Sequence, residues 1–319
     1  MEAEIAKSAC RKIRVAGFRA GIYIRIMATI DVLLLLALSA IWGGSFIFMR
    51  YLAPLIGPVA TADMRMFIAG VFMALLFLAV GFKPEWRKNW KHYLVIGVLN
   101  SAVPFLLYSM AALHLPASME AIFNSMSPMF GAVFSAIWLK EALTARKVTG
   151  LLLGVAGVVV MSSLGGLDAS AATILSVVAC VCAPMCYGLA GIYIKKRAGG
   201  VKPVAIAGGS QLAGGLALMP FLLAAPPPAG AITVQAALLV AAFALLCSAL
   251  AYLIYYRLIA SVGPTKALTV TFLIPVFAMF WGFLFLGEAI TGSMLAGCAV
   301  ILVGTFLVAA PRRRTVAQA

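Results

Sequence analysis

The second half of this chain repeats the first, and each half carries an odd number of long apolar segments. Five positions recur as the same residue type 147 positions later. The first copy is Pro128, Glu141, Thr144, Gly150 and Gly157, and the second is Pro275, Glu288, Thr291, Gly297 and Gly304. An odd number of crossings in each copy places the two copies upside down relative to one another. This pattern is typical of alternating-access transporters.

The apolar segments are long enough to cross a membrane. Of 319 residues, 64% are hydrophobic and 10% are charged, which leaves too little polar surface for a soluble domain of this size. A helix of about twenty residues crosses ~30 Å of hydrocarbon. We predict an all-α membrane protein with ten transmembrane helices arranged as two inverted five-helix repeats. The predicted spans are residues 30–50, 61–82, 93–113, 117–138, 145–164, 171–194, 203–225, 235–257, 265–286 and 290–310.

Basic residues mark one side of the predicted membrane. All 24 Lys and Arg except Arg50 and Arg65 fall in the N-terminal segment, the even-numbered connections or the C-terminal tail. The positive-inside rule then places both termini in the cytoplasm. The net charge of +15 therefore reflects orientation in the membrane, and we expect no nucleic-acid partner.

The chain divides into four predicted parts: a basic cytoplasmic segment (1–29), a first five-helix repeat (30–164), a second repeat (171–310) and a basic cytoplasmic tail (311–319). We expect the N-terminal segment to contact anionic membrane lipid. No P-loop or metalloprotease motif is present, so we predict neither an enzyme nor a cofactor. Cys182 and Cys186 share a helix face, but packing explains them without a metal. Energy for transport would come from a gradient of substrate, protons or another ion.

Matching residues interrupt both repeats. Pro128 and Pro275 fall inside the fourth and ninth predicted helices, where each removes a backbone hydrogen bond and can bend its helix. Interrupted helices at matching positions point to a binding site at the membrane midplane. The alternative is that the prolines only shape packing. Glu141 and Glu288 end these helices, and we predict that they cap the amides of the helices that follow.

These residues resemble the drug/metabolite transporter superfamily, and specifically its ten-span EamA-type exporters. The hallmark, a Pro-bearing span followed by Glu-x-x-Thr and a Gly-rich span, stands at residues 127–150 and again at 274–297. The Trp-Gly start of the first span and the Arg-Phe of the second are matched at 41–46 and 64–67, and the resemblance covers about residues 30–310. The sixth span departs from the pattern, with Tyr187 in place of the tryptophan. The resemblance implies a bacterial inner-membrane protein that moves small metabolites, often amino acids, outward through a central cavity.

Polar and aromatic side chains within the predicted helices mark the candidate cavity. The predicted substrate-binding residues are Trp42, Asn100, Tyr108, Glu120, Asn124, Tyr187, Tyr252 and Tyr255. Tyr108 and Tyr255 lie 147 positions apart, so they occupy equivalent places in the two repeats. For each tyrosine alone, packing is the alternative interpretation, and for Trp42 the alternative is an anchor at the membrane interface.

Two charged residues are candidates for selecting the substrate. Glu120 could bind a substrate amine or take up a proton, because burial favours the neutral carboxyl. Alternatively, it is a first-turn acid that the helix dipole favours. Arg65 is expected to pair with Glu120, with Asp63 or with a substrate carboxylate, and a purely structural ion pair is the alternative.

We therefore predict a secondary transporter that exports small metabolites, with amino acids the expected cargo, by alternating access through a central cavity. The same fold could instead export drugs, purine-like or sugar-derived compounds. A different class is a non-transporting membrane scaffold or a lipid-handling protein. The expected partners are the small-molecule substrate, membrane lipid and protons as a coupling ion, with the chain acting as a monomer or homodimer.

Overall fold

The computed structural model describes residues 2–164, 170–263, 267 and 269–309, with the backbone alone at 2–28 and 162–164. Every regular element within these residues is helical, which confirms the all-α prediction. The first repeat contains α1 (Glu2–Ile56), α2 (Pro58–Ala79), α3 (Trp86–Gly97), the π-helical turn η1 (Val98–Ala102), α4 (Val103–Ala111), α5 (Ala117–Asn124), α6 (Ser127–Leu139) and α7 (Ala145–Leu164). The second contains α8 (Ala171–Arg197), α9 (Pro203–Ala224), α10 (Val234–Ala244), the π-helical turn η2 (Leu245–Leu250), α11 (Ala251–Val262), α13 (Val270–Leu286) and α14 (Gly292–Ala309).

Helices lie at the positions of all the predicted spans, and most have the length and composition of membrane helices. In the described part of the chain, eight helical stretches are long and apolar enough to cross a membrane, and α13 is apolar but shorter. The first of these stretches begins at Thr29, and the helical backbone of α1 continues N-terminally into the basic segment. The Gly165–Asp168 break and the C-terminal tail lie outside the described residues.

The prolines interrupt the two repeats differently. Pro128 stands in the first turn of α6, after a break in the helix at Ser125 and Met126. Pro275 lies inside α13, whose helix continues on both sides of it. The predicted interruption is therefore present in the fourth segment, whereas the described part of the ninth is one helix.

Other backbone irregularities recur in both repeats. The turns η1 and η2 begin 147 positions apart, each in the third segment of its repeat. Lys140 and Gly287, also 147 apart, both adopt left-handed conformations, with φ of 55° and 65°. The residue that follows, Glu141 or Glu288, donates its N–H to the carbonyl six positions earlier, at 3.3 and 3.1 Å. The two copies thus share local structure that no single motif would have predicted.

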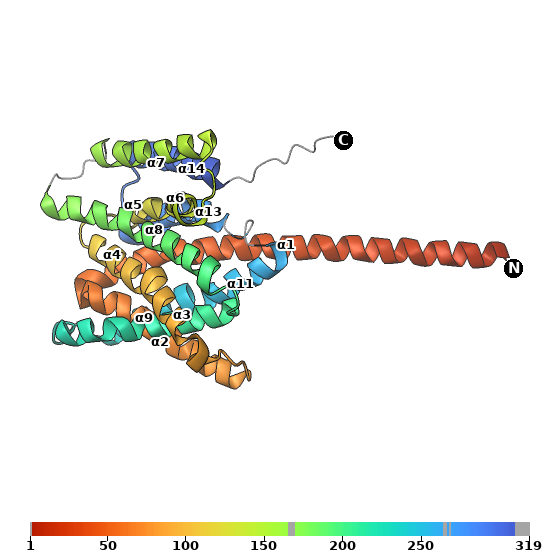
Figure 1. Ribbon diagram of the computed structural model, residues 1–319, viewed down its shortest axis with the longest axis horizontal. Coiled ribbons are helices and arrows are strands. Elements are labelled where there is room, and N and C mark those ends of the chain that lie inside the picture. Colours follow the sequence, from red (N-terminus) through yellow and green to blue (C-terminus); the bar gives the residue numbers. More distant parts are fainter. Residues whose placement is uncertain (1, 165–169, 264–266, 268, 310–319) are drawn as a thin grey trace.

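Helices α7 and α14 meet through their glycines and run antiparallel, side by side in Figure 1. Gly150 packs against Gly304, where an added Cβ would lie 2.5 Å from the Gly304 carbonyl oxygen. Gly157 packs against Gly297, and a Cβ added to Gly157 would lie 3.0 Å from the Gly297 carbonyl oxygen. Since lipid gives helices no hydrophobic reason to associate, this close backbone approach supplies the contact.

A second antiparallel pair, α2 and α9, lies at the opposite side of the molecule in Figure 1 and repeats this arrangement. Gly70 packs against Leu212, and Gly215 packs against Phe67. Gly70 and Gly215 occupy equivalent positions in the two repeats, as do Phe67 and Leu212. The two contacts are therefore equivalent to one another, as are the two glycine contacts between α7 and α14. A pseudo-twofold axis therefore passes between both pairs, perpendicular to the helices.

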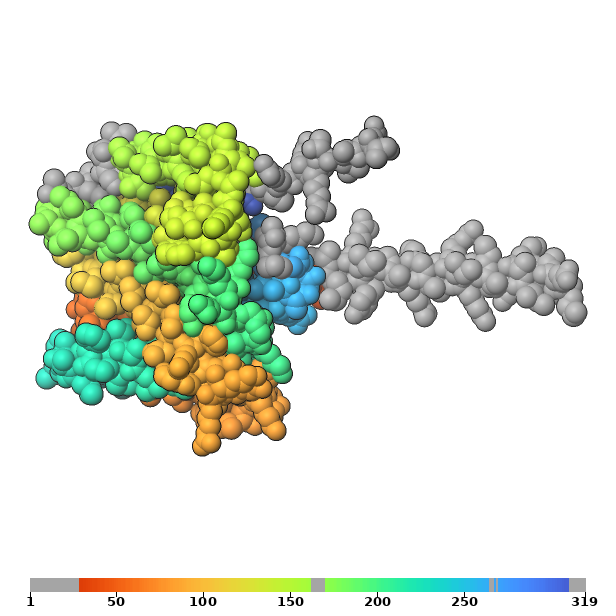
Figure 2. Space-filling model, in the orientation of Figure 1, coloured from red at the N-terminus to blue at the C-terminus, as the bar shows by residue number. Residues whose placement is uncertain are grey.

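The outer surface is apolar, in the manner of a protein solvated by lipid. On α7, whose surface is yellow-green in Figure 2, Leu152, Val155 and Val159 are exposed while Gly150 and Gly157 face α14. Large side chains point outward and small ones inward, the reverse of the pattern in a soluble helix.

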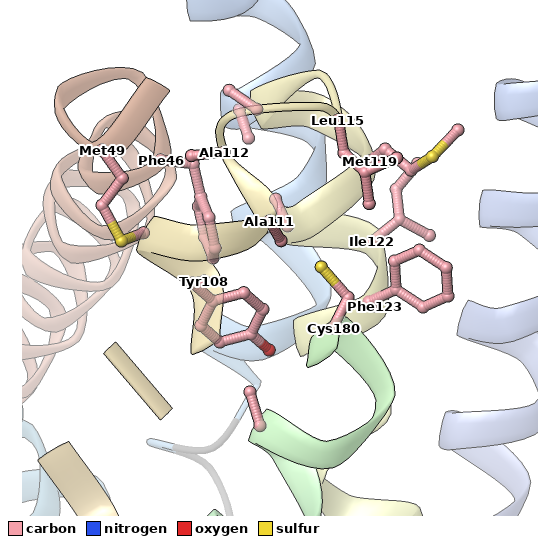
Figure 3. Close-up of a cluster of buried hydrophobic side chains, with 14 of the residues drawn as sticks. Phe46, Met49, Tyr108, Ala111, Ala112, Leu115, Met119, Ile122, Phe123 and Cys180 are labelled. Carbon is pink, nitrogen blue, oxygen red and sulfur yellow. The ribbon is translucent and has the colours of Figure 1, made fainter. Parts of the chain in front are cut away.

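The main hydrophobic core surrounds the short helix α5. Helices α1, α8, α13 and α14 pack against it, and Figure 3 shows Met119, Ile122 and Phe123 of α5 beside Tyr108 of α4 and Cys180 of α8. All α5 residues from Ala117 to Phe123 are buried. This helix therefore lies inside the bundle, and polar groups on it must find partners within the protein.

The glycine contact between α7 and α14 generates the first prediction. The change Gly304→Ala should lower the free energy of unfolding by about 1–3 kcal/mol, because the new methyl group would overlap the Gly150 carbonyl oxygen. Thermal unfolding in detergent measures this effect. Gly191→Ala on α8 is the matched control, because its Cβ would meet nothing within 4 Å and alanine favours a helix. Equal effects of the two changes would contradict the interpretation.

Candidate functional site

A cavity of about 220 Å³ lies between the two repeats. The first repeat lines it with α1, α2, η1, α4, α5 and α6, and the second with α8, α11 and α13. Its walls include Arg65 and seven of the predicted substrate-binding residues: Trp42, Asn100, Tyr108, Asn124, Tyr187, Tyr252 and Tyr255. The structure thus brings together residues chosen from spans far apart in sequence. Their role in substrate binding remains a prediction.

Several cavity residues were not predicted from the sequence. Phe46 and Met49 share the cavity face of α1 with Trp42, at helical spacings of four and seven. That spacing was a usable signal, because residues at those intervals lie on one face. Phe105 and Thr271 also line the cavity and have no comparable signal in the sequence.

Arg65 of α2 is held in the cavity wall by neutral groups. Its Nε donates to Ser248 Oγ at 2.9 Å and its Nη2 donates to the Cys247 carbonyl oxygen at 3.3 Å. The guanidinium carbon lies 3.8 Å from the ring centre of Phe105 and 4.4 Å from that of Phe243. These contacts fix the plane of the guanidinium while leaving its charge unneutralised.

No carboxylate pairs with Arg65 among the described residues. The ion pairs in this part of the chain involve Lys88, Lys147 and Lys195, and the predicted partners Glu120 and Asp63 form none. Within the part of the chain that the structure describes, the residues that line the cavity include no Asp or Glu. Of the three predicted partners of Arg65, Glu120 and Asp63 form no ion pair with it, and a substrate carboxylate remains.

The second repeat contains a neutral equivalent of the Arg65 contact. Gln211 of α9 donates from Nε2 to Ser101 Oγ of η1 at 3.4 Å. Ser101 and Ser248 are 147 positions apart, so each repeat attaches a side chain of its second helix to the π turn of the other. Only the contact from α2 is charged. The cavity is therefore symmetric in its backbone and asymmetric in its charge.

Aromatic rings and hydroxyl groups form most of the remaining wall. Trp42 meets Tyr252 edge-on, with ring centres 6.1 Å apart, and lies 5.3 Å from Tyr255. Asn100 donates to the Tyr252 hydroxyl at 3.4 Å, and Tyr108 donates to Asn124 Oδ1 at 3.3 Å. Such a wall offers aromatic faces to a cation and polar atoms to a small ligand.

Glu120 lies outside the cavity lining, in contrast to its prediction as a substrate contact. It stands in the first turn of α5, as the alternative interpretation held, and its side chain is fully buried. Neither carboxyl oxygen has a hydrogen-bond partner among the described residues. The Glu120 carboxyl is therefore not part of the cavity lining in this conformation, and its role toward a substrate amine remains a prediction.

The amides at the start of α5 are bound by Glu288 instead. The Ala117 N–H donates to Glu288 Oε1 at 2.8 Å, and the Ser118 N–H donates to Oε2 at 3.3 Å. The Ser118 hydroxyl donates to the same Oε2 at 2.9 Å. Gly282 makes room for this carboxylate, because a Cβ there would lie 2.6 Å from Oε2. Glu288 therefore caps a helix of the other repeat.

The predicted caps of α7 and α14 are formed by threonines. Thr144 and Thr291 directly precede these helices, and their hydroxyls accept the N–H groups three residues on, at 3.4 and 3.2 Å. The prediction that Glu141 and Glu288 cap them therefore differs from the structure. Thr144 and Thr291 occupy the N-cap position itself, where a side-chain oxygen reaches those amides directly.

Glu141 forms an ion pair on the surface. Lys195 Nζ lies 2.8 Å from its Oε1 and Lys147 Nζ lies 4.0 Å from its Oε2. The hydrogen bond from Lys195 holds the pKa of the Glu141 carboxyl below its ordinary value, against a small opposing effect of burial. The pair therefore stabilises the fold above the ordinary carboxyl range and is lost as pH falls through the lowered pKa. Exposure keeps the effect small.

Comparisons with known proteins agree with the repeat. Residues 29–163 and 174–310 each match the EamA-like transporter family. An uncharacterized transporter, YvbV of Bacillus subtilis, is 28% identical over 282 residues, which cover 86% of this chain and 90% of the relative. A "Probable terminal-alkyne amino-acid exporter" of Streptantibioticus cattleyicolor is 22% identical, with 87% and 91% covered. A solved crystal structure, 17% identical, has the same fold, with a TM-score of 0.61 over 88% of this chain and 97% of the other.

The different roles of Glu141 and Glu288 generate the second prediction. Glu288→Ala should lower the free energy of unfolding by about 1–3 kcal/mol, since it leaves donors at the start of α5 without an acceptor. Glu141→Ala, the equivalent change in the first repeat, should cost at most about 1 kcal/mol, because it removes an exposed ion pair. Unfolding of both variants at neutral pH measures the difference, and a larger loss for Glu141→Ala would refute the assignment.

Proposed function

The chain belongs to the EamA-like transporter family, and from that premise we propose that it exports small carboxylate-bearing metabolites, with amino acids the favoured class. It is an integral, multi-pass protein of the bacterial inner membrane, and the two matched regions contain its apolar helices. The observation that carries the proposal is Arg65, a buried cation on the wall of a small cavity whose described lining residues include no Asp or Glu.

A buried guanidinium without a carboxylate is costly, and a ligand carboxylate would offset that cost. Arginine presents parallel N–H donors that suit a carboxylate, and here Phe105 and Phe243 hold its plane in place. A volume of about 220 Å³ lies below the range typical of drug-sized ligands, which favours a small metabolite.

An amino acid would also bring an ammonium group and a side chain. The ring centre of Trp42 lies 6.1 Å from that of Tyr252 and 5.3 Å from that of Tyr255, and these rings offer π faces to a cation. Aromatic surface equally suits an apolar side chain. The relative from Streptantibioticus cattleyicolor, whose name describes amino-acid export, lends the same class further support.

The arrangement of the repeats supports alternating access. We place ten spans across the membrane, with α7 and α13 completing the eight long apolar stretches, and both termini in the cytoplasm as the basic connections indicate. The antiparallel contacts of α7 with α14 and of α2 with α9 support copies inverted in the membrane. Rocking of one group of helices against the other would expose the cavity to each side in turn.

Two alternatives make different demands on the cavity. A cargo of drugs, purine-like or sugar-derived compounds would keep the fold but would not need an unpaired arginine. A membrane scaffold or lipid-handling protein would need neither the arginine nor the polar lining. The absence of an acidic partner for Arg65 among the described residues favours a carboxylate substrate over both.

Arg65 provides the test of substrate class. In proteoliposomes given a panel of labelled amino acids, Arg65→Gln should raise KM at least about tenfold, because a hydrogen-bonded charge pair is worth about 1.5–3 kcal/mol. Ser248→Ala removes the Nε acceptor of Arg65 and should raise KM less. Ser101→Ala, the equivalent change beside the neutral Gln211, is the matched control and should leave KM near the wild-type value. Unchanged amino-acid KM in Arg65→Gln would exclude the carboxylate role.

The cavity hydroxyls distinguish a transporter from a scaffold. The double change Tyr108→Phe and Tyr255→Phe keeps both rings but removes two polar atoms from the lining, so amino-acid flux should fall about tenfold at roughly 0.5–1.5 kcal/mol for each hydroxyl. Flux per folded protein in proteoliposomes measures this change. Tyr93→Phe, at a buried tyrosine outside the cavity lining, is the control. A scaffold would give no flux in any of these proteins.

A further inference from the structure

Glu120 is a buried acid that the substrate cavity does not use. Its side chain is fully buried in the first turn of α5, and both carboxyl oxygens lack hydrogen-bond partners among the described residues. Figure 3 shows Met119, Ile122 and Phe123 of α5, which belong to the main hydrophobic core around this helix. An ionised carboxylate without donors in such surroundings is very costly, whereas a neutral carboxylic acid costs far less.

The ionisable groups that face Glu120 come from each side of α5. Glu288 approaches from the connection between α13 and α14, and Arg50 approaches from α1. Tyr108 of α4 and Cys180 of α8 complete the surroundings. Arg50 donates from Nη1 to the Ala112 carbonyl oxygen and forms no ion pair with Glu120. Tyr108 donates its hydroxyl to Asn124, away from the carboxyl.

Two carboxyl groups therefore share the start of one helix and have different environments. Glu288 accepts two backbone N–H groups and a hydroxyl, which suits a carboxylate. Glu120 accepts nothing, which suits a neutral acid. If both were ionised, like charges would repel inside the protein, where screening is weak. The arrangement needs a proton, and Glu120 is the residue fitted to hold it.

We propose that Glu120 is a proton-binding site whose proton keeps the α13–α14 connection docked, through Glu288, on the start of α5. The inference rests on the proposed function: with ten spans and both termini in the cytoplasm, the start of α5 and the α13–α14 connection lie on the outer side of the membrane. It identifies the proton as the coupling ion. Loss of the proton would place two negative charges at the start of α5. Repulsion would then release Glu288 from Ala117 and Ser118 and open the outer end.

This assignment gives an order of events for export. With the outer end open, Glu120 is ionised and can take a proton from the external solution. Protonation permits Glu288 to dock, which buries the proton and closes the outer end. The equivalent Glu141, at the inner end, is exposed in this conformation and is paired with Lys195. The two ends of the molecule are therefore in different states, as alternating access requires.

The test measures docking directly and needs no substrate. Spin labels at Leu113 and Ile290, both exposed and on either side of the contact, report its separation in a background whose native cysteines are replaced. In otherwise unchanged protein, the distance should shift to longer values as pH rises from 5 to 10. Glu120→Gln, a neutral isostere, should keep the short distance throughout, and Glu141→Gln should respond as the unchanged protein does.

A pH response that persists in Glu120→Gln, or no response in the unchanged protein, would overturn the proposal. Hydrogen exchange at the Ala117 and Ser118 amides of the native chain, corrected for intrinsic rates, provides a second measurement of the same contact. If the pH response is present while amino-acid flux is absent, the proton site stands and the proposed cargo fails. If amino-acid flux is present while the pH response is absent, the proposed cargo stands and the proton site fails.

Discussion

Close backbone contact between the two repeats is the interaction on which the rest of this structure depends. Lipid provides no hydrophobic drive for helices to associate, so the copies are joined where side chains are absent. Gly150 and Gly157 meet Gly304 and Gly297 on one side of the molecule, and Gly70 and Gly215 permit the second approach. The cavity lies between the copies that these contacts fix, and its walls come from both.

On this shared frame, function resides in the differences between equivalent positions. Ser101 and Ser248 occupy equivalent π turns, but one meets a neutral glutamine and the other a charged arginine. Glu141 and Glu288 follow equivalent left-handed residues, yet one forms a surface ion pair and the other caps a buried helix. In the proposed mechanism, the symmetry of the repeats lets the cavity open at either end, and the charges without an equivalent in the other repeat would set its preferred ligand and its direction.

Much of this was predictable because the repeat offset carries three-dimensional information. It paired Tyr108 with Tyr255 and led to cavity residues on spans far apart in sequence. The partners of the acidic residues were not predictable in that way. Glu288 binds Ala117, 171 positions away, and only the packing of α13 against α5 creates that contact. The burial of Glu120 depends equally on four surrounding helices. The threonine caps, by contrast, had a local signal, since Thr144 and Thr291 directly precede their helices.

The π turns have a mechanical meaning for the third segment of each repeat. Before η1, α3 packs against α9, whereas after it α4 packs against α8; likewise α10 packs against α2 before η2, and α11 packs against α1 after it. One extra residue in a turn rotates the following part of a helix by about 100° about its axis. The parts before and after the turn can therefore pack against different neighbouring helices. Residues 98–102 and 245–250 are thus joints between two packing groups. Rotation of one group against the other would be concentrated there, beside the ligand that Asn100 and Tyr252 would contact.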